Sequence, residues 1–161
     1  MAVSAILHFV YDNNSHCFTD LHKPLLQNRL QSYAHGSHKK GAPLTNCFAY
    51  IDGTVRPLCR PTRYQSICYN GHERIHAIKF QSIVTPDGMI GNMYGPIVGC
   101  RHDCALLRIS GIIDQLEAAD MRDPNGLPYA VYGDPAYPIR NYLLCPFKGA
   151  NLTDRQQNFT R

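Results

Sequence analysis

Three aspartates stand in settings where a carboxylate can do chemistry. Asp52 lies in Tyr-Ile-Asp-Gly-Thr, Asp103 in Arg-His-Asp-Cys and Asp134 in Tyr-Gly-Asp-Pro-Ala-Tyr, with spacings of 51 and 31 residues. Asp52 and Asp134 each follow a short β-prone run, at 48–51 and 129–132. A carboxylate that ends a strand faces the crevice in which α/β sheets bind ligands. Converging carboxylates are oxygen ligands for hard cations such as Mg²⁺, and two such ions about 3.5–4 Å apart serve many nucleases and polymerases.

Each aspartate also has a simpler explanation. Asp52 precedes a glycine in a common turn pair, Asp134 precedes a proline that favours a turn, and Asp103 is placed to cap a helix. The order of the elements favours the metal site over these separate roles. We expect Asp52 and Asp134 to end two adjacent strands, with carboxylates close enough to share one cation and with Asp103 on the same side.

The elements that must position these side chains follow from periodicity. Residues 75–84 alternate as a strand with His76, Ile78, Phe80, Ser82 and Val84 on one face, and residues 85–88 form a turn. Further strands are expected at 48–51, 89–94 and 129–132, a short strand or helix end at 142–144, helices at 21–33 and 103–119, and a loop at 34–43. The order predicts an α/β fold, a mixed sheet with packed helices. We divide the chain into a helical or irregular segment, 1–45, and a domain, 46–161.

Two zinc interpretations are weaker. His72-Glu-Arg-Ile-His76 matches the zincin motif, which works only on a helix. In a strand the two histidines would lie about 13 Å apart at ~3.3 Å per residue, and the sequence supplies no third ligand. Cys100 and Cys104 flank His102, yet no Cys-x2-Cys pair completes a structural site. Seven cysteines without regular spacing or a secretory signal indicate reduced thiols.

Basic and aromatic residues interleave between Asp52 and the predicted hairpin. Arg56, Arg60 and Arg63 alternate with Tyr64 and Tyr69, a mixture that suits a nucleic-acid strand as well as a solvated loop. The net charge of +4 permits a phosphate-bearing partner without establishing one. No run approaches the ~18 apolar residues of a membrane span.

Several motifs together resemble one known family, the DDE nuclease domain of PIF/Harbinger-type transposases. They are Tyr50-Ile-Asp-Gly-Thr-Val-Arg-Pro-Leu-Cys-Arg-Pro61, Tyr69-Asn-Gly-His72, His76-Ala-Ile-Lys-Phe-Gln-Ser82, Tyr94-Gly-Pro96, Arg101-His-Asp103 and Tyr132-Gly-Asp-Pro-Ala-Tyr-Pro138. The likeness covers roughly residues 40–161, in order. It implies an RNase H-like mixed sheet with flanking helices, a divalent cation (Mg²⁺ or Mn²⁺) and cleavage or transfer of DNA strands.

The resemblance also assigns roles to residues. It maps the acidic motifs onto Asp52, Asp103 and Asp134, with Asp52 and Asp134 as the catalytic pair and all three as metal ligands. We expect DNA contacts from a second set: Arg56, Arg60, His72, Arg74 and His102. The expected partners are DNA and a helical DNA-binding protein, with no membrane, and the expected location is the nucleus.

One departure from the family pattern matters. The family's catalytic Glu lies on a later helix, whereas this chain stops at Arg161, 27 residues after Asp134, with Asp154 as its only later acid. We therefore expect a truncated nuclease domain that lacks the C-terminal part of the fold and is weak or inactive. The alternative is a non-catalytic transposase remnant that acts as a DNA- or protein-binding module.

Overall fold

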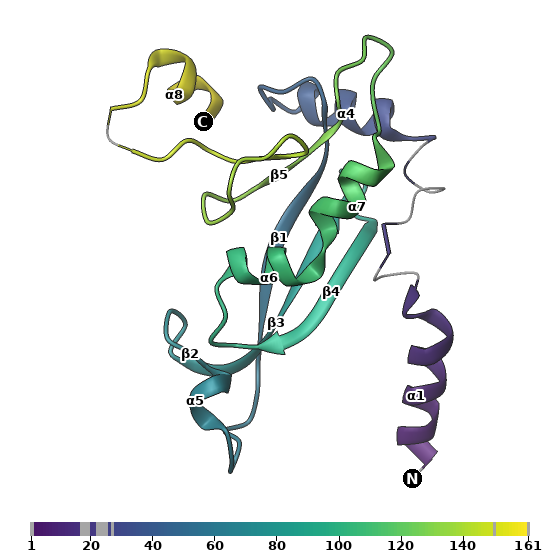
Figure 1. The fold of residues 1–161 in the computed structure, drawn as a ribbon, viewed down its shortest axis with the longest axis vertical. Helices are drawn as coiled ribbons and strands as arrows, with labels where there is room; N and C mark the ends of the chain where they lie inside the picture. The colour runs from purple at the N-terminus through teal and green to yellow at the C-terminus, as the bar shows by residue number, and fades with distance from the viewer. Residues whose placement is uncertain (1, 17–19, 22–25, 27, 150, 161) are drawn as a thin grey trace.

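A mixed β-sheet forms the centre of the protein (Figure 1). The computed structural model describes residues 2–16, 20, 21, 26, 28–149 and 151–160. The path through the sheet runs β3–β1–β5–β6, and β4 and the short β2 also pair with β3. The predicted fold class, α/β with a mixed sheet, is confirmed.

The antiparallel half of the sheet contains the longest strands. β1 (Cys47–Pro57) pairs with β3 (Ile75–Val84), and β3 turns back into β4 (Ile90–Val98). The predicted hairpin is confirmed, although β4 extends four residues beyond the expected end. Along β3 the side chains that become buried are Ala77, Lys79, Gln81 and Ile83, on the face opposite His76 and Ile78.

The parallel half is shorter and brings distant parts of the chain together. β5 (Ala130–Gly133) pairs with β1, and β6 (Leu143–Leu144) pairs with β5, both in parallel. Both strands match the expected positions. A register shift between Cys47 and Ala49 marks a bulge where β1 meets β5.

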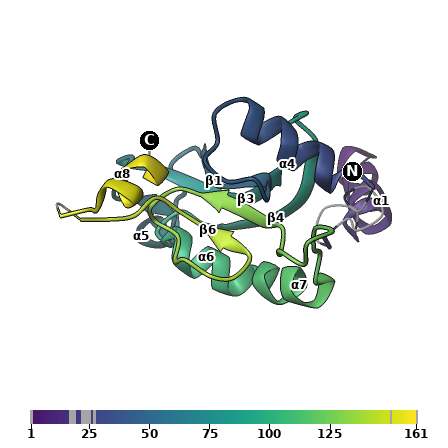
Figure 2. The same cartoon turned by 90° about the horizontal axis from the view of Figure 1, so that it is seen from above.

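Helices cover both faces of the sheet, as the view from above shows (Figure 2). α4 (Leu30–Lys39) lies on one face, while α6 (Asp103–Ser110) and α7 (Ile112–Ala119) lie on the other. The core side chains of α4 recur at helical spacing on one face of the sheet, and those of α6 and α7 cover the other face. They are Leu30, Tyr33, Ala34, Ser37, Leu106, Leu107, Ile112 and Leu116.

Two helix predictions need correction. The expected loop at 34–43 is wrong, because α4 continues to Lys39, and its residues Ala34 and Ser37 are buried. The expected single helix at 103–119 is wrong as well, because Gly111 adopts a left-handed φ of 64° and separates α6 from α7. The expected helix at 21–33 falls partly outside the described residues. Because α4 shares its core cluster with β1, the division at residue 45 stays a prediction.

The remaining helices lie at the margins. α1 (Ala2–Asn14) extends away from the sheet in Figure 1, with Phe9 and Tyr11 exposed. α8 (Asp154–Thr160) places Phe159 against Tyr132 and Phe147. Among the helices of the described residues, none is both long and apolar enough to cross a membrane.

Candidate active site

Asp52 and Asp134 belong to adjacent parallel strands. Ile51 and Gly133 are register partners, so each aspartate is the next residue along its strand. Asp134 follows β5 directly, as expected. Asp52 does not end its strand, which is a correction: it is the sixth residue of β1, which continues to Pro57. β5 stops at this level while β1 continues, so the edge of the sheet beside Asp52 opens to solvent.

Both carboxylates are exposed and partly engaged by the backbone. One oxygen of Asp52 accepts a hydrogen bond from the N–H of Gly53 at 2.8 Å, and one oxygen of Asp134 accepts one from the N–H of Ala136 at 2.9 Å. Within the described part of the chain, the second oxygen of each carboxylate accepts no hydrogen bond. Each aspartate therefore keeps an oxygen free for an external ligand.

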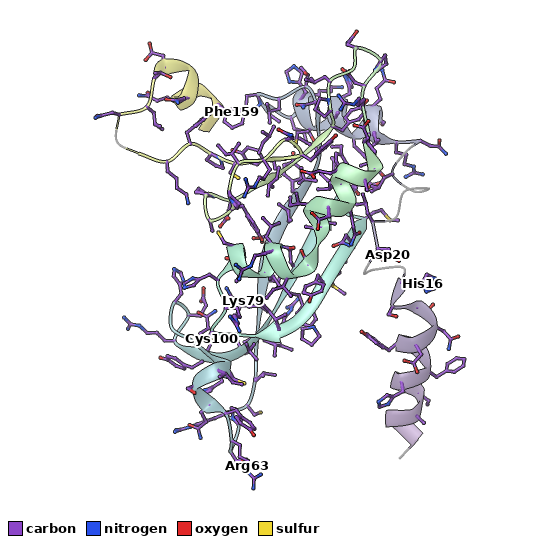
Figure 3. All side chains as sticks on the ribbon, in the orientation of Figure 1. His16, Asp20, Arg63, Lys79, Cys100 and Phe159 are labelled. Atoms are coloured by element: carbon purple, nitrogen blue, oxygen red, sulfur yellow. The ribbon has the colours of Figure 1, made fainter. Side chains whose placement is uncertain are left out.

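Asp103 has a different environment. It is the first residue of α6 and the cap position belongs to His102, so the capping role considered for Asp103 is wrong. Its Oδ1 accepts a hydrogen bond from Nζ of Lys79 at 3.0 Å, and both side chains are largely buried, with 24% and 10% exposed. This oxygen also approaches the backbone of β1: a Cβ added to Gly53 would lie 2.7 Å from it. Figure 3 shows Lys79 at the centre of the molecule, beneath α6.

A buried tyrosine links the three acidic residues. Tyr137 packs its ring on Gly133, where an added Cβ would meet the ring at 2.8 Å, and its hydroxyl accepts a hydrogen bond from Gln81 at 3.4 Å. Burial strongly raises the pKa of this hydroxyl, against the Gln81 hydrogen bond, which lowers it. The charges of Asp103, Asp52 and Asp134 raise it further, so all three carboxylates act on one buried group.

The donor chemistry suits a hard cation at the exposed pair. Carboxylate oxygens are the ligands that Mg²⁺ and Mn²⁺ prefer, and Mg²⁺ commonly keeps several waters beside one or two carboxylates. Across the residues that the structure describes, no group of three or more His, Cys, Asp or Glu side chains lies close enough to hold a metal ion. A two-carboxylate site at Asp52 and Asp134 fits this arrangement, while the ligand role of Asp103 stays a prediction.

The residues expected to contact DNA come from a few neighbouring parts of the chain. They occupy the end of β1, the segment between β1 and β3 and the position before α6, and all are exposed: Arg56, Arg60, His72, Arg74 and His102. His102 directly precedes Asp103, and Arg56 lies four residues after Asp52 on β1. Two of these basic groups, Arg56 and His102, therefore lie close in sequence to the aspartates. Their contact with DNA stays a prediction.

The zincin alternative is wrong. Gly71 to Arg74 form a turn, and His76 lies in β3, so the two histidines do not share a helical face. His72 instead pairs with its neighbour Glu73 at 3.4 Å, and the ring of His76 contacts Tyr69 edge to face. The segment therefore has the turn-and-strand geometry that the alternation after Ile75 predicted.

Sequence reasoning missed three residues that support the site. Lys79 and Gln81 line the inner face of β3, and Ser110 Oγ donates a hydrogen bond to the Gln81 side chain at 3.0 Å. The signal was present in the alternation itself, because these two polar residues fall on the face opposite His76 and Ile78. Tyr137 was visible only as part of a motif, since nothing in the sequence shows that its ring lies under Gly133.

Comparison with known proteins agrees with the geometry. The family model described as DDE superfamily endonuclease matches residues 51–161, more than half of the chain. The match begins at the residue before Asp52 and includes Asp103 and Asp134. No curated protein and no solved structure matches the chain. The mixed sheet with helices on both faces is consistent with the RNase H-like fold of these enzymes. The chain belongs to the DDE superfamily endonucleases.

Proposed function

We propose that this protein is a divalent-metal-dependent DNA endonuclease or strand-transfer domain, derived from a transposase, with Asp52 and Asp134 as its catalytic carboxylates. Membership of the family supports a metal-dependent nuclease acting on DNA. The observation that carries the assignment is the parallel pairing of β1 and β5, which sets two exposed carboxylates one residue past the partners Ile51 and Gly133.

The roles follow from the free oxygens. Asp52 and Asp134 each keep one unengaged oxygen that could bind a cation, while the hydrogen bonds from Gly53 and Ala136 fix the orientation of each carboxylate. A bound Mg²⁺ or Mn²⁺ would supply charge neutralisation at the phosphate and lower the pKa of an attacking water. The aspartates hold that centre at an open edge of the sheet, which a DNA backbone can approach.

Asp103 acts as a positioning residue in this proposal. Its Oδ1 accepts a hydrogen bond from Lys79, and the same oxygen lies close to the backbone of β1 at Gly53, the residue after Asp52. A buried carboxylate that is neutralised by a lysine has less charge to offer a cation. The pair therefore holds the backbone of β1 at the level of Asp52, rather than serving as a third ligand in the arrangement described.

The same proposal extends to the family type, the location and the partner of the protein. The motifs favour the PIF/Harbinger type, a nuclear location and a separate helical DNA-binding partner protein. We propose weak activity, because two-metal chemistry needs enough ligands for both ions, whereas no group of three or more His, Cys, Asp or Glu side chains among the described residues could hold a metal ion. Small misplacements of reacting groups cost orders of magnitude in rate.

Calorimetric titration with Mn²⁺ tests the site. We expect weak binding by the wild type and its loss in both Asp52→Asn and Asp134→Asn. Asp114→Asn is the matched control, because Asp114 is an exposed carboxylate on α7, and it should bind Mn²⁺ as the wild type does. A plasmid-nicking assay with Mn²⁺ should then give trace cleavage that the two site variants abolish.

The possible results separate the alternatives. Unchanged Mn²⁺ binding in both site variants would contradict the metal site. Robust cleavage that Asp134→Asn abolishes would confirm the site and contradict the expected weakness. DNA binding without Mn²⁺ binding or nicking would instead support a non-catalytic remnant that acts as a binding module.

A further inference from the structure

A protruding arm, residues 56–76, extends from the sheet on the side opposite α4 (Figure 1). It contains the end of β1, the short helix α5 (Gln65–Cys68), β2 (Tyr69–Asn70) and the turn into β3. Figure 3 shows Arg63 at its far end. The metal site described above makes no use of this arm.

The arm is strongly basic. Four arginines, Arg56, Arg60, Arg63 and Arg74, stand against one acid, Glu73, which pairs with His72. Arg60 donates to the side chain of Gln65 at 3.0 Å, and within the described part of the chain the other three make no ion pair. An uncompensated cluster of guanidinium groups attracts a polyanion.

Exposed apolar and aromatic side chains accompany these charges. Tyr64 is 76% exposed beside Arg63, Tyr69 is 42% exposed, and Leu58 and Ile67 are 40% and 44% exposed. Tyr64 also adopts a left-handed φ of 58° at the start of α5, a conformation that is uncommon for a residue with a side chain. The fold thus holds a ring in solvent at the tip of a basic projection.

The arm is fixed to the sheet by its backbone. The N–H of Leu58 donates to the carbonyl of His76 at 2.8 Å, and the N–H of Cys100 donates to the carbonyl of Ile67 at 3.2 Å. Gly99 lies so close that an added Cβ would meet the carbonyls of Ala77 and Cys68 at 2.5 and 2.7 Å. These contacts set the position of the tip relative to β1 and hence relative to Asp52.

We propose that the arm binds unpaired bases of a DNA strand by stacking on Tyr64 and Tyr69, with its arginines on the flanking phosphates. This inference rests on the proposed function for the choice of DNA. Ring stacking needs an open base face, which a continuous duplex hides inside its stack, whereas basic residues alone hold either form. Because the arm combines exposed tyrosine rings with arginines, it favours DNA that is single-stranded or frayed where the DNA contacts the arm.

The geometry also sets where the unpaired bases lie. Pro57 lies five residue steps after Asp52 along β1, about 16 Å at ~3.3 Å per residue. In a duplex, successive phosphates of one strand lie about 3.4 Å apart along the helix axis, so the base of the arm lies roughly five base pairs from the phosphate at Asp52 if the DNA between them is paired. We expect the stacked bases at that distance or beyond it.

Fluorescence anisotropy in EDTA tests the proposal without any cleavage chemistry. The probes are a labelled duplex, the same duplex with a single-stranded extension, and the single strand alone. We expect tighter binding to the two probes with unpaired bases. Tyr64→Ala should weaken binding to them by about 5-fold or more, which is the lower limit for losing one stacked base, while duplex binding changes little.

Matched variants isolate the ring from the charge. Tyr64→Phe keeps the ring and should bind as the wild type does. Tyr11→Ala removes a tyrosine of similar exposure, 64%, from α1 and should change nothing. Arg63→Gln should weaken binding to all three probes equally. It should also reduce the slope of the logarithm of the binding constant against the logarithm of the salt concentration by about one, the loss of one phosphate contact.

Two results would overturn the arm proposal. One is equal affinity of the wild type for duplex and unpaired probes, and the other is equal loss by Tyr64→Ala on every probe. Tighter binding to an RNA strand of the same sequence would overturn the assignment to DNA. The metal site is tested separately, because Mn²⁺ titration of Asp52→Asn and Asp134→Asn is done without DNA, whereas these probes are bound in EDTA without a free cation.

Discussion

Lys79 is the buried residue that holds Asp103 in place beneath the candidate site. It is one of the few charged side chains in the core, and it satisfies Asp103 at 3.0 Å. Removing one partner of a buried pair leaves the other charge without compensation. The pair is therefore a point where a small chemical change has a large effect on stability.

Lys79→Met tests this. We expect a loss of about 2 kcal/mol of unfolding free energy, below the range for fully buried pairs because Asp103 keeps partial access to water. Urea denaturation measures it. Lys79→Met with Asp103→Leu should recover part of the loss, since no unpaired charge is then buried. A double variant less stable than Lys79→Met would contradict the pairing.

Gly53 is the second residue with a sharp prediction. Gly53→Ala places a Cβ at 2.7 Å from Oδ1 and 3.1 Å from Cγ of Asp103, so either the carboxylate or β1 must move. We expect a loss of about 1–3 kcal/mol in a urea denaturation experiment, as for other overpacked sites. Gly91→Ala is the matched control in β4, because its Cβ would meet Leu26 at an ordinary 3.5 Å.

Asp52 should respond to Gly53→Ala even though its own side chain is unchanged. If β1 moves to relieve the clash, Mn²⁺ affinity at Asp52 and Asp134 should fall, whereas Gly91→Ala should leave it unchanged. Weaker Mn²⁺ binding in Gly53→Ala alone supports the positioning role of Asp103. Equal binding in both variants would contradict it.

At the scale of elements, two glycines in helical regions should respond oppositely to the same change. Gly36 lies inside α4 and Gly111 between α6 and α7, and an added Cβ has open space at both. Gly36→Ala should stabilise the protein by about 0.5–1 kcal/mol through helix propensity. Gly111→Ala should destabilise it by about 1–2 kcal/mol, because its φ of 64° is unfavourable for alanine.

Thermal or urea denaturation of both variants checks the pair. The two results share one mechanism, the backbone freedom of glycine, and differ only in the sign of φ. If Gly111→Ala also stabilised the protein, α6 and α7 would be able to join into the single helix that the sequence predicts.

The elements predicted well were those with a complete periodic pattern. The alternation at 75–84, the turn at 85–88 and the strand before Asp134 all match the structure. α4 was missed because Gly36 and the His and Lys residues around it suggested a loop, whereas Leu30, Tyr33, Ala34 and Ser37 carried a helical spacing. The break at Gly111 depends on a left-handed φ, which composition does not specify.

The adjacency of the strands that carry Asp52 and Asp134 was predictable, whereas the residues around them were not. Strand order placed Asp52 and Asp134 together, because a carboxylate after each run was visible in the sequence. The pairing of Lys79 with Asp103 joins residues on β3 and α6 whose contact depends on how α6 packs. Such contacts follow from tertiary packing, which the sequence alone does not specify.

At the scale of the whole molecule, stability should fall at high pH. Cys47 is 2% exposed, and burial raises the pKa of its thiol to about 11 from 9.0. The thiol ionises in the unfolded chain first, so stability is lost as pH rises from about 9 to about 11.

Cys47→Ala isolates this contribution. At pH 7 the variant should be less stable than the wild type by about 1 kcal/mol, because it leaves a small cavity. Between pH 8 and pH 11 the difference should shift in favour of the variant by roughly 2 kcal/mol, the value of a two-unit rise in pKa. Urea denaturation at both pH values measures the shift, and a constant difference would contradict it.

Charge is unevenly distributed over the molecule. The arm is basic, whereas α7 and the segment after it carry Asp114, Glu117, Asp120 and Asp123, with Arg122 paired to Asp120. In Figure 1 these regions lie toward opposite ends of the long axis. A polyanion approaching the protein is attracted at one end and repelled at the other, which favours one orientation of a DNA strand along β1.

The parallel pairing of β1 with β5 also has a consequence for biosynthesis. Ile51 and Gly133 meet across the sheet although 82 residues separate them. At roughly 5–20 residues per second, a ribosome completes β5 several seconds after β1. During that interval β1 can pair with β3 but has an open edge where β5 will later lie, and an open edge can pair with other chains. The two strands that carry Asp52 and Asp134 therefore meet late, so the proposed metal site would be incomplete in the nascent chain until β5 is made.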